Sequence, residues 1–264
     1  MSYVEVEKVN FQYKINELRK KDILNFQTNY FMNEISEDAI CLENDNAIIC
    51  LTQDRDIYRL YFAHINLLDF ENLLKQLPLN KKVSLEIITK GELDVNLSNC
   101  VNKYIPYETT FERMRAKCDE ILISRIYNHN EIQFATREDI NIIYDSLNTV
   151  FFHHTSHLPT QNELLDLINN KQVLCVKNNN KLASFIVYKP EGIQARFDQF
   201  LSIDKNIKNT MMLMDYFVSE LKYKKFKTCY LWVDIVKNKP AQLMYKYYKF
   251  KSENLKSFVF SKFI

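Results

Sequence analysis

Glycine is the residue that this sequence most clearly lacks. Of its 264 residues only 2 are glycine, whereas average usage would give about 18. A dinucleotide-binding fingerprint needs three glycines within six residues, and a phosphate-binding P-loop needs two that lie five positions apart. Gly91 and Gly192 can build neither. Glycine-dependent Rossmann, P-loop and protein-kinase sites are therefore excluded.

The sequence also lacks an excess of charge of either sign. Lys and Arg together number 35 against 33 Asp and Glu, which leaves a net charge of +2. No single-sign field therefore points to a nucleic acid or a membrane surface as a partner. The basic run 222–227 ends a predicted helix, where lysines complement the helix dipole.

Long apolar runs and paired cysteine motifs are missing as well. No stretch approaches the roughly 20 apolar residues that a membrane helix needs, and the first residues have no signal-peptide pattern. We therefore expect a cytoplasmic chain with no membrane partner. Without an export signal or a CxxC spacing, the cysteines are expected to be buried thiols. There are 6 of them: Cys41, Cys50, Cys100, Cys118, Cys175 and Cys229.

Two stretches of alternating strand and helix patterns predict two α/β domains, 1–120 and 121–264, joined in the region 117–130. In the first, the patterns predict strands at 47–51, 57–65, 83–88 and 104–114. Apolar residues at helical spacing predict a helix over 68–77, with Asp69 as its cap and Pro78 as its stop.

The second half has a more regular order of elements. A strand at 132–136 leads into a helix capped by Thr136, and Thr160 with Glu163 forms a capping box for a second helix. Strands at 172–177, 182–189 and 193–203 follow, separated by turn residues typical of an antiparallel meander. A helix from about 206, a strand at 228–235, a helix from about 238 and a strand at 257–263 complete the order.

The last of these helices carries a family resemblance. Asn238, Ala241, Tyr245 and Phe250 fit the final-helix pattern of the GNAT superfamily of acyl-CoA-dependent N-acetyltransferases, with Lys249 where that pattern has glycine. Together with the element order, this makes 131–264 similar to a GNAT domain, and the first half resembles a degenerate second copy. The resemblance implies an α/β fold of two GNAT-like domains, each a central mixed sheet flanked by helices.

The resemblance also implies where the donor, acetyl-CoA, would bind. The family's phosphate loop aligns with 205–210, so that Lys205, Lys208, Asn209 and Thr210 would hold the pyrophosphate, although both glycine positions of the loop are lost. Lysine charge and free helix N–H groups could substitute for them, or the segment could be a solvated helix start with no ligand.

Further donor contacts follow from the same resemblance. Asn238 would bind the pantetheine arm, cap its own helix, or do both. Backbone groups of Phe200, Leu201 and Ser202 would line the place where the sheet parts to receive that arm and the thioester carbonyl.

Direct attack of an amine on a thioester requires a group that protonates the leaving thiolate and a route for the proton of the amine. Tyr245 stands where the family places its general acid, and Asp198 is the candidate base. The alternatives are a core tyrosine and an exposed strand aspartate.

Three histidines, His153, His154 and His157, cluster in a predicted loop. They lack the glutamate and the helical spacing of a zinc site, so we expect no metal. The loop would lie beside the acceptor pocket in a GNAT domain, so that these residues either bind the acceptor or form a plain surface loop.

Taken together, the sequence predicts transfer of an acyl group, most simply acetyl, from acyl-CoA to a small-molecule or peptide amine. Two alternatives stay open. One is a non-catalytic module that kept the fold and lost the donor site. The other is a transferase that takes an aminoacyl group from tRNA, for which the modest charge offers little support.

Overall fold

The computed structural model describes residues 9–31, 35, 39–77, 81–121 and 131–262. The chain forms two compact units, one of residues 1–110 with 255–264 and one of residues 111–254. The limit between them falls inside β6 (Tyr107–Lys117) and inside β12 (Lys251–Lys262). The expected division at 120/121 differs from this, because the end of β12 groups with the first unit. The segment 122–130, where the junction was expected, lies outside the described residues.

The first unit is a sheet of six described strands with helices on both of its faces. Its sheet order is β2-β3-β4-β5-β12, with β1 paired to β4 on the side away from β3. Apart from β12, the elements of this unit have the following bounds: α1 (Val9–Lys21), β1 (Gln27–Thr28), β2 (Ile40–Glu43), β3 (Ala47–Asp54), β4 (Ile57–His64), α2 (Leu67–Leu74), β5 (Val83–Lys90) and α3 (Val95–Asn102).

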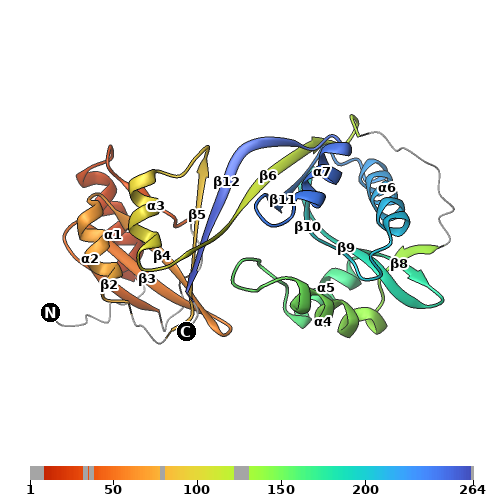
Figure 1. Ribbon diagram of the computed structural model, residues 1–264, viewed down its shortest axis with the longest axis horizontal. Helices are drawn as coiled ribbons and strands as arrows, with labels where there is room; N and C mark the ends of the chain where they lie inside the picture. The colour runs from red at the N-terminus through yellow and green to blue at the C-terminus, as the bar shows by residue number, and fades with distance from the viewer. Residues whose placement is uncertain (1–8, 32–34, 36–38, 78–80, 122–130, 263–264) are drawn as a thin grey trace. The chain divides into compact units, whose positions relative to one another are not determined.

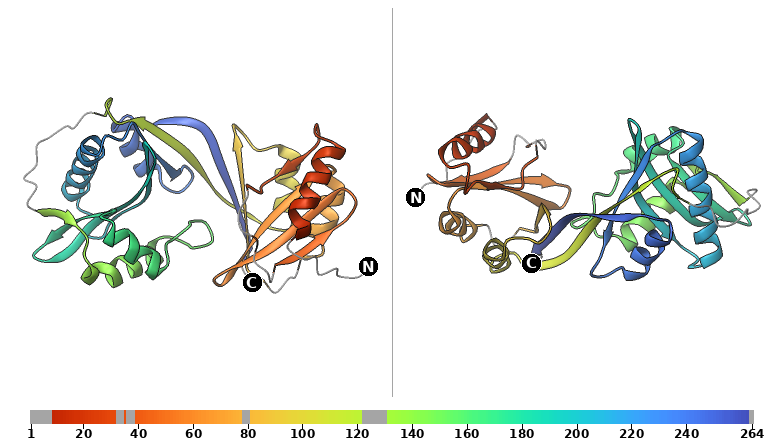
Figure 2. Two further views of the ribbon diagram at one scale, coloured as in Figure 1. Left: turned by 180° about the vertical axis from the view of Figure 1, so that it is seen from behind. Right: turned by 90° about the horizontal axis from the view of Figure 1, so that it is seen from above.

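Each face of this sheet has its own core. Phe11 and Leu18 of α1 pack on one face with Ile48 of β3. Phe70 of α2 packs on the other with Leu60 of β4, in a cluster that also includes residues of α3. The right-hand view of Figure 2 shows α1 on one side of the strands and α2 with α3 on the opposite side.

The predicted strands of this unit are confirmed, but the predicted cap of its helix is wrong. α2 begins after Asn66, whose Oδ1 accepts hydrogen bonds from the backbone N–H groups of Leu68 and Asp69. Asp69 is therefore inside the first turn. Pro78, the expected stop, lies outside the described residues, and α2 ends at Leu74.

The cysteines also require one correction. Cys41 of β2 and Cys50 of β3 face each other directly across the antiparallel pair, with their Cα atoms 4.1 Å apart, and are joined by a disulfide. The expectation of free thiols was wrong for this pair, because the strand register that brings them together cannot be read from their spacing. The other four cysteines are free and buried, as expected.

The second unit is a six-stranded sheet in the order β6-β11-β10-β9-β8-β7. Its other elements are β7 (Ile132–Phe134), a 3₁₀ turn (Arg137–Asp139), α4 (Ile140–Val150), α5 (Gln161–Asn169), β8 (Val173–Asn178), β9 (Lys181–Glu191), β10 (Gln194–Ser202), α6 (Ile207–Tyr223), β11 (Thr228–Asp234) and α7 (Lys239–Tyr247).

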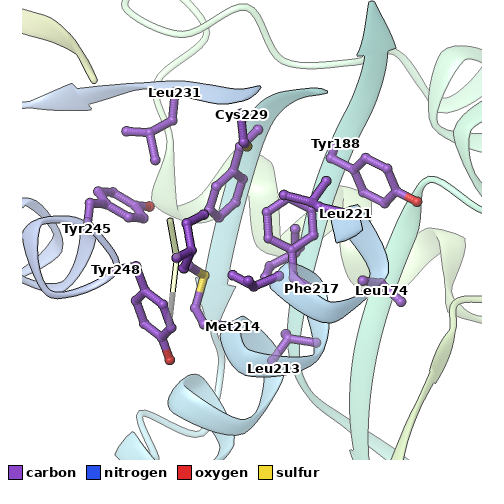
Figure 3. Packing of buried hydrophobic residues seen from close by; sticks show 14 of the residues in the cluster. Leu174, Tyr188, Leu213, Met214, Phe217, Leu221, Cys229, Leu231, Tyr245 and Tyr248 are labelled. Atoms are coloured by element: carbon purple, nitrogen blue, oxygen red, sulfur yellow. The ribbon is translucent and has the colours of Figure 1, made fainter. Parts of the chain in front are cut away.

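Helices cover both faces of this sheet too (Figure 1). α6 and α7 pack on one face, where Phe217, Leu221 and Tyr248 meet Tyr188 and Leu231 of the strands (Figure 3). α4 and α5 pack on the other face, over β8 and β9. No helix within the described ranges is long and apolar enough to span a bilayer.

The predicted cap Thr136 precedes the 3₁₀ turn Arg137–Asp139, and α4 itself begins after Asp139. The other local signals of the second half are confirmed. Thr160 and Glu163 form the reciprocal capping box of α5. Asn206 caps α6 and Asn238 caps α7. β8, β9 and β10 form the expected antiparallel meander.

Candidate functional site

The sheet of the second unit opens between β10 and β11. The two strands pair in parallel only over the register from Gln194↔Thr228 to Phe197↔Leu231. A register shift after Phe197 marks a β-bulge at Asp198, and from there β10 stays paired with β9 alone. No described strand pairs with the other edge of β10 beyond this point. We call this place the β10–β11 opening; its free backbone groups can bind an extended ligand as an added strand would.

Tyr245 of α7 lies at the start of the β10–β11 opening. Its side chain is 8% exposed and meets the ring of Phe197 edge-to-face, with the ring centroids 5.7 Å apart. Phe250 packs on it at 5.9 Å. Burial raises the pKa of the Tyr245 phenol above its usual 10, with a smaller contribution from Cys229. The phenol is therefore protonated throughout the neutral range.

A second buried tyrosine of this region has a different environment. The Tyr248 hydroxyl donates to Asp215 Oδ1 at 2.8 Å, whereas no hydrogen bond joins the Tyr245 hydroxyl to another described residue. The two hydroxyls point in different directions (Figure 3). Tyr248 is thus held within the core, and Tyr245 keeps its donor group available.

Asp198, the candidate base, is engaged in ion pairs. Arg196 donates through Nε to Oδ1 at 2.6 Å and through Nη2 to Oδ2 at 3.3 Å, and Lys189 Nζ lies 3.8 Å from Oδ2. Burial alone would lower the pKa of Arg196, but the hydrogen bonds and charge of Asp198 raise it. Both carboxylate oxygens of Asp198 are therefore already bound by cationic side chains.

The predicted donor-lining residues Phe200, Leu201 and Ser202 follow the bulge on the same strand. Phe200 packs toward the face covered by α6 and α7, and Leu201 packs toward the face covered by α4 and α5. Their backbones therefore form the edge of the β10–β11 opening, between its two faces.

The start of α6 is more heavily occupied than the sequence suggested. Asn209 is 4% exposed, and its Nδ2 donates to Asp204 Oδ2 at 2.6 Å. The Thr210 hydroxyl donates to the Asn206 carbonyl at 3.0 Å. Lys205, with φ of 54°, and Lys208 are exposed.

Asn238 has a structural role that the geometry shows directly. Its Oδ1 accepts from the backbone N–H of Ala241 at 3.2 Å, at the beginning of α7. This is the capping role expected of asparagine at that position.

The histidine loop is attached beside β10. Phe151 and Leu158, which flank it, pack in the same apolar cluster as Leu201. His154 stacks on Phe152 with centroids 5.4 Å apart, His153 is half-buried and His157 is exposed. Within the described ranges, no three His, Cys, Asp or Glu side chains are arranged to hold a metal ion.

The first unit has an equivalent opening, which the chain fills with its own residues. β4 and β5 pair in parallel only at Tyr58↔Val83 and Arg59↔Ser84. Beyond that point β1 lies against β4, on the edge not used by β3. We call this place the β4–β5 opening.

Asn29, directly after β1, bridges both sides of the β4–β5 opening. Its Nδ2 donates to the carbonyls of Leu60 at 2.9 Å and Glu86 at 3.0 Å, and its Oδ1 accepts from the N–H of Phe62 at 2.7 Å. The Thr28 hydroxyl donates to the Phe62 carbonyl at 2.5 Å. The backbone groups that an extended ligand would use are therefore already paired.

Sequence reasoning did not identify Asp204, Arg196 or Asn29. Asp204 stands two residues before a capping asparagine, a spacing that could have marked it as a second acceptor at the helix start. Arg196 and Asp198 are two positions apart on one strand and so share a face, which made their contact detectable from the predicted strand. Asn29 had no local signal, since its three partners lie 31 to 57 positions away.

Comparison with known proteins shows the fold and no close relative. No protein-family model matches the sequence, and no curated protein matches it. Among solved structures, a GCN5-related N-acetyltransferase from Sphaerobacter thermophilus is similar at 10% identity, with 82% of this chain and 76% of that chain covered and a TM-score of 0.56.

Two further solved structures are similar over a comparable share of the chain. A conserved protein of unknown function from Staphylococcus epidermidis has 12% identity, 89% and 98% coverage and a TM-score of 0.56. A tandem GNAT protein from the clavulanic acid biosynthesis pathway has 8% identity, 82% and 78% coverage and a TM-score of 0.52. The chain thus has the two-domain α/β fold found in GNAT proteins, and the expected fold class is confirmed.

Proposed function

We propose that this chain is an N-acyltransferase that moves an acyl group, acetyl in the simplest case, from a pantetheine thioester such as acetyl-CoA to an amine. The observation that supports this most directly is the open edge of β10 beside Tyr245. A pantetheine arm is an extended chain with two amides, and such a chain can pair with an unpaired strand edge.

The donor is assigned to the second unit because only its opening is free. The β4–β5 opening is filled by β1 and Asn29, whereas no described segment fills the β10–β11 opening. We therefore expect one donor molecule per chain. Backbone groups of Phe200, Leu201 and Ser202 would bind the arm, with Asn238 near the leaving-group end.

The reaction needs little covalent help from the protein. The amine nitrogen attacks the thioester carbonyl carbon, the new C–N bond forms, the C–S bond breaks, and Tyr245 donates a proton to the departing sulfur. With its pKa raised by burial, Tyr245 carries its proton before this step. The amine proton leaves to water, from which Tyr245 regains its proton, and we assign Asp198 a positioning role, because Arg196 already binds both of its oxygens.

The acceptor amine would approach on the face that carries Asp198 and the histidine loop. This is the face on which Phe151 and Leu158 hold that loop beside β10. A small-molecule or peptide amine is the class of acceptor that we propose, with His153, His154 and His157 as candidate contacts.

The experiment combines donor binding with turnover. At 100 times its Kd, acetyl-CoA should stabilise the chain by about 2.7 kcal/mol, and an amine panel should release free thiol. Tyr245→Phe should lower kcat by about 100-fold and leave the donor Kd unchanged, since a general acid contributes of that order. Tyr247→Phe is the matched control, because Tyr247 is on the same helix and 55% exposed.

Two results would contradict the proposal. If Tyr245→Phe weakens donor binding and leaves kcat intact, Tyr245 is a packing residue. If neither acetyl-CoA nor S-acetylpantetheine binds, the chain is a non-catalytic module with this fold.

A further inference from the structure

The start of α6 carries a carboxylate at the position where a donor's phosphates would have to bind. Asp204 Oδ1 accepts from the backbone N–H of Asn206 at 3.0 Å and from the Ser202 hydroxyl at 3.2 Å. Its Oδ2 accepts from Asn209 Nδ2 at 2.6 Å and lies 3.5 Å from Asn178 Nδ2. One fixed negative charge thus collects four polar hydrogens from three elements.

The backbone N–H groups around Asp204 are largely used within the protein. Those of Ile203 and Asp204 itself donate to the Ala183 carbonyl. That of Lys208 donates to Asn206 Oδ1 at 2.9 Å, and that of Thr210 donates to the Asn206 carbonyl at 3.0 Å. A helix N-terminus binds an anion through such free N–H groups, and here those of Asn206 and Lys208 already have side-chain acceptors.

The charge of Asp204 also disfavours the binding of a diphosphate at the start of α6. Asp204 is exposed and carries a negative charge at the positive end of the α6 dipole, so that it neutralises the field that would attract a diphosphate. Lys205 and Lys208 are exposed as well, and ion pairs between flexible surface side chains and a solvated anion contribute little.

The opening that would take the pantetheine arm is not affected by this arrangement. The unpaired edge of β10 begins at Asp198, whereas the Asp204 network begins at Ser202. The thioester end of a donor would therefore meet the unpaired edge of β10, whereas its diphosphate would meet the hydrogen-bonded carboxylate of Asp204.

We propose that the chain recognises its acyl donor through the pantetheine arm, and that the diphosphate and nucleotide of a coenzyme A thioester add little to donor affinity. This inference rests on the proposed acyl transfer. It implies that pantetheine thioesters in general can serve as donors, and that Asp204 is the residue that removes the preference for a coenzyme A thioester.

The test compares acetyl-CoA with S-acetylpantetheine, which has no phosphate, in binding and in thiol release. For the unaltered chain the two Kd values should agree within about threefold. Asp204→Asn keeps an oxygen acceptor for the Asn206 N–H and removes the charge, so it should lower the Kd of acetyl-CoA about tenfold and leave that of S-acetylpantetheine within twofold. Asp145→Asn is the control, because Asp145 is an exposed aspartate of α4.

The outcomes separate this inference from the proposed function. If acetyl-CoA binds more than about 30-fold tighter than S-acetylpantetheine, or if Asp204→Asn changes both Kd values alike, the selectivity inference is overturned while acyl transfer stands. Asp204→Ala repeats the comparison without the side-chain amide. If neither donor binds, the proposed function fails, and this inference fails with it.

Discussion

Replacing Asn29 tests the claim that the first unit fills its own opening. Asn29 is 6% exposed and makes three hydrogen bonds, to Leu60, Phe62 and Glu86, at 2.7 to 3.0 Å. Each such bond contributes about 0.5 to 1.5 kcal/mol net, so Asn29→Ala should cost about 3 kcal/mol. The loss includes the backbone groups left without partners between β4 and β5.

The assay must report on the first unit alone, because a two-unit chain need not unfold in one step. Hydrogen exchange at the Phe62 amide does so, since that N–H donates to Asn29 Oδ1. A loss of 3 kcal/mol corresponds to about 100-fold faster exchange where local opening limits the rate. Asn25→Ala is the control, because Asn25 makes only exposed contacts with Asp22.

A second substitution separates hydrogen bonding from space filling. Asn29→Asp keeps the shape but places an acceptor against two carbonyl oxygens and buries a charge, so it should destabilise more than Asn29→Ala. If Asn29→Asp is nearly neutral, or if Asn29→Ala costs less than about 1 kcal/mol, the residue is only a filler and the β4–β5 opening is not closed by hydrogen bonding.

Two further predictions concern stability. Burial lowers the pKa of His64 from 6.5 to about 4; the unfolded chain therefore takes up this proton first, and stability should fall by about 2 to 3 kcal/mol as the pH drops from 7 to 4.5. His64→Phe should remove that dependence in acid titrations followed by circular dichroism, and an unchanged profile would contradict the assignment. Lys225→Gly and Lys249→Gly should each raise the free energy of unfolding by about 0.5 to 1 kcal/mol, because both lysines have φ above 60°. A residue with a Cβ costs about 1 to 2 kcal/mol in this left-handed conformation, and the backbone entropy of glycine offsets part of the gain. A lower Tm in both variants would refute this.

Features that depend on neighbouring residues were predictable from the sequence. The capping box of Thr160 with Glu163 and the caps Asn206 and Asn238 each involve residues at most four positions apart, and all three stand in the structure. The exception, Asp69 in place of Asn66, was a choice between two good caps three positions apart. Local chemistry allows both, and the structure has Asn66.

Features that depend on strand register were not predictable. The disulfide of Cys41 with Cys50 requires that β2 and β3 pair with these residues opposite each other. The pair of Arg196 with Asp198 is different, because residues two positions apart on one strand share a face without any register information. A shift of one residue in the β2–β3 register would place Cys41 opposite a residue whose side chain lies on the other face of the sheet, and composition and periodicity do not fix that register.

The scarcity of glycine separates into two effects with different consequences. α5, α6 and α7 each end in a Schellman motif, in which the residue that usually is glycine is Lys171, Lys225 or Lys249, with φ of 54°, 61° and 65°. Lysine there costs backbone strain but also complements the helix dipole, so the fold persists. Lys249, the departure from the GNAT pattern in the last helix, is of this kind and leaves Tyr245 in place.

At the start of α6, in contrast, the absence of glycine does not strain the backbone. Lys208 and Thr210 lie within the helix and have no positive φ, so that nothing in the backbone requires glycine at these positions. Glycine there would serve only the close approach of a ligand to the backbone. Since the N–H groups of both residues have internal acceptors, its absence is consistent with a helix start that has no phosphate to approach. The same compositional deficit is therefore structural at the helix ends, and we propose that it is functional at this one helix start; Asp204→Asn tests the proposal without disturbing the helix ends.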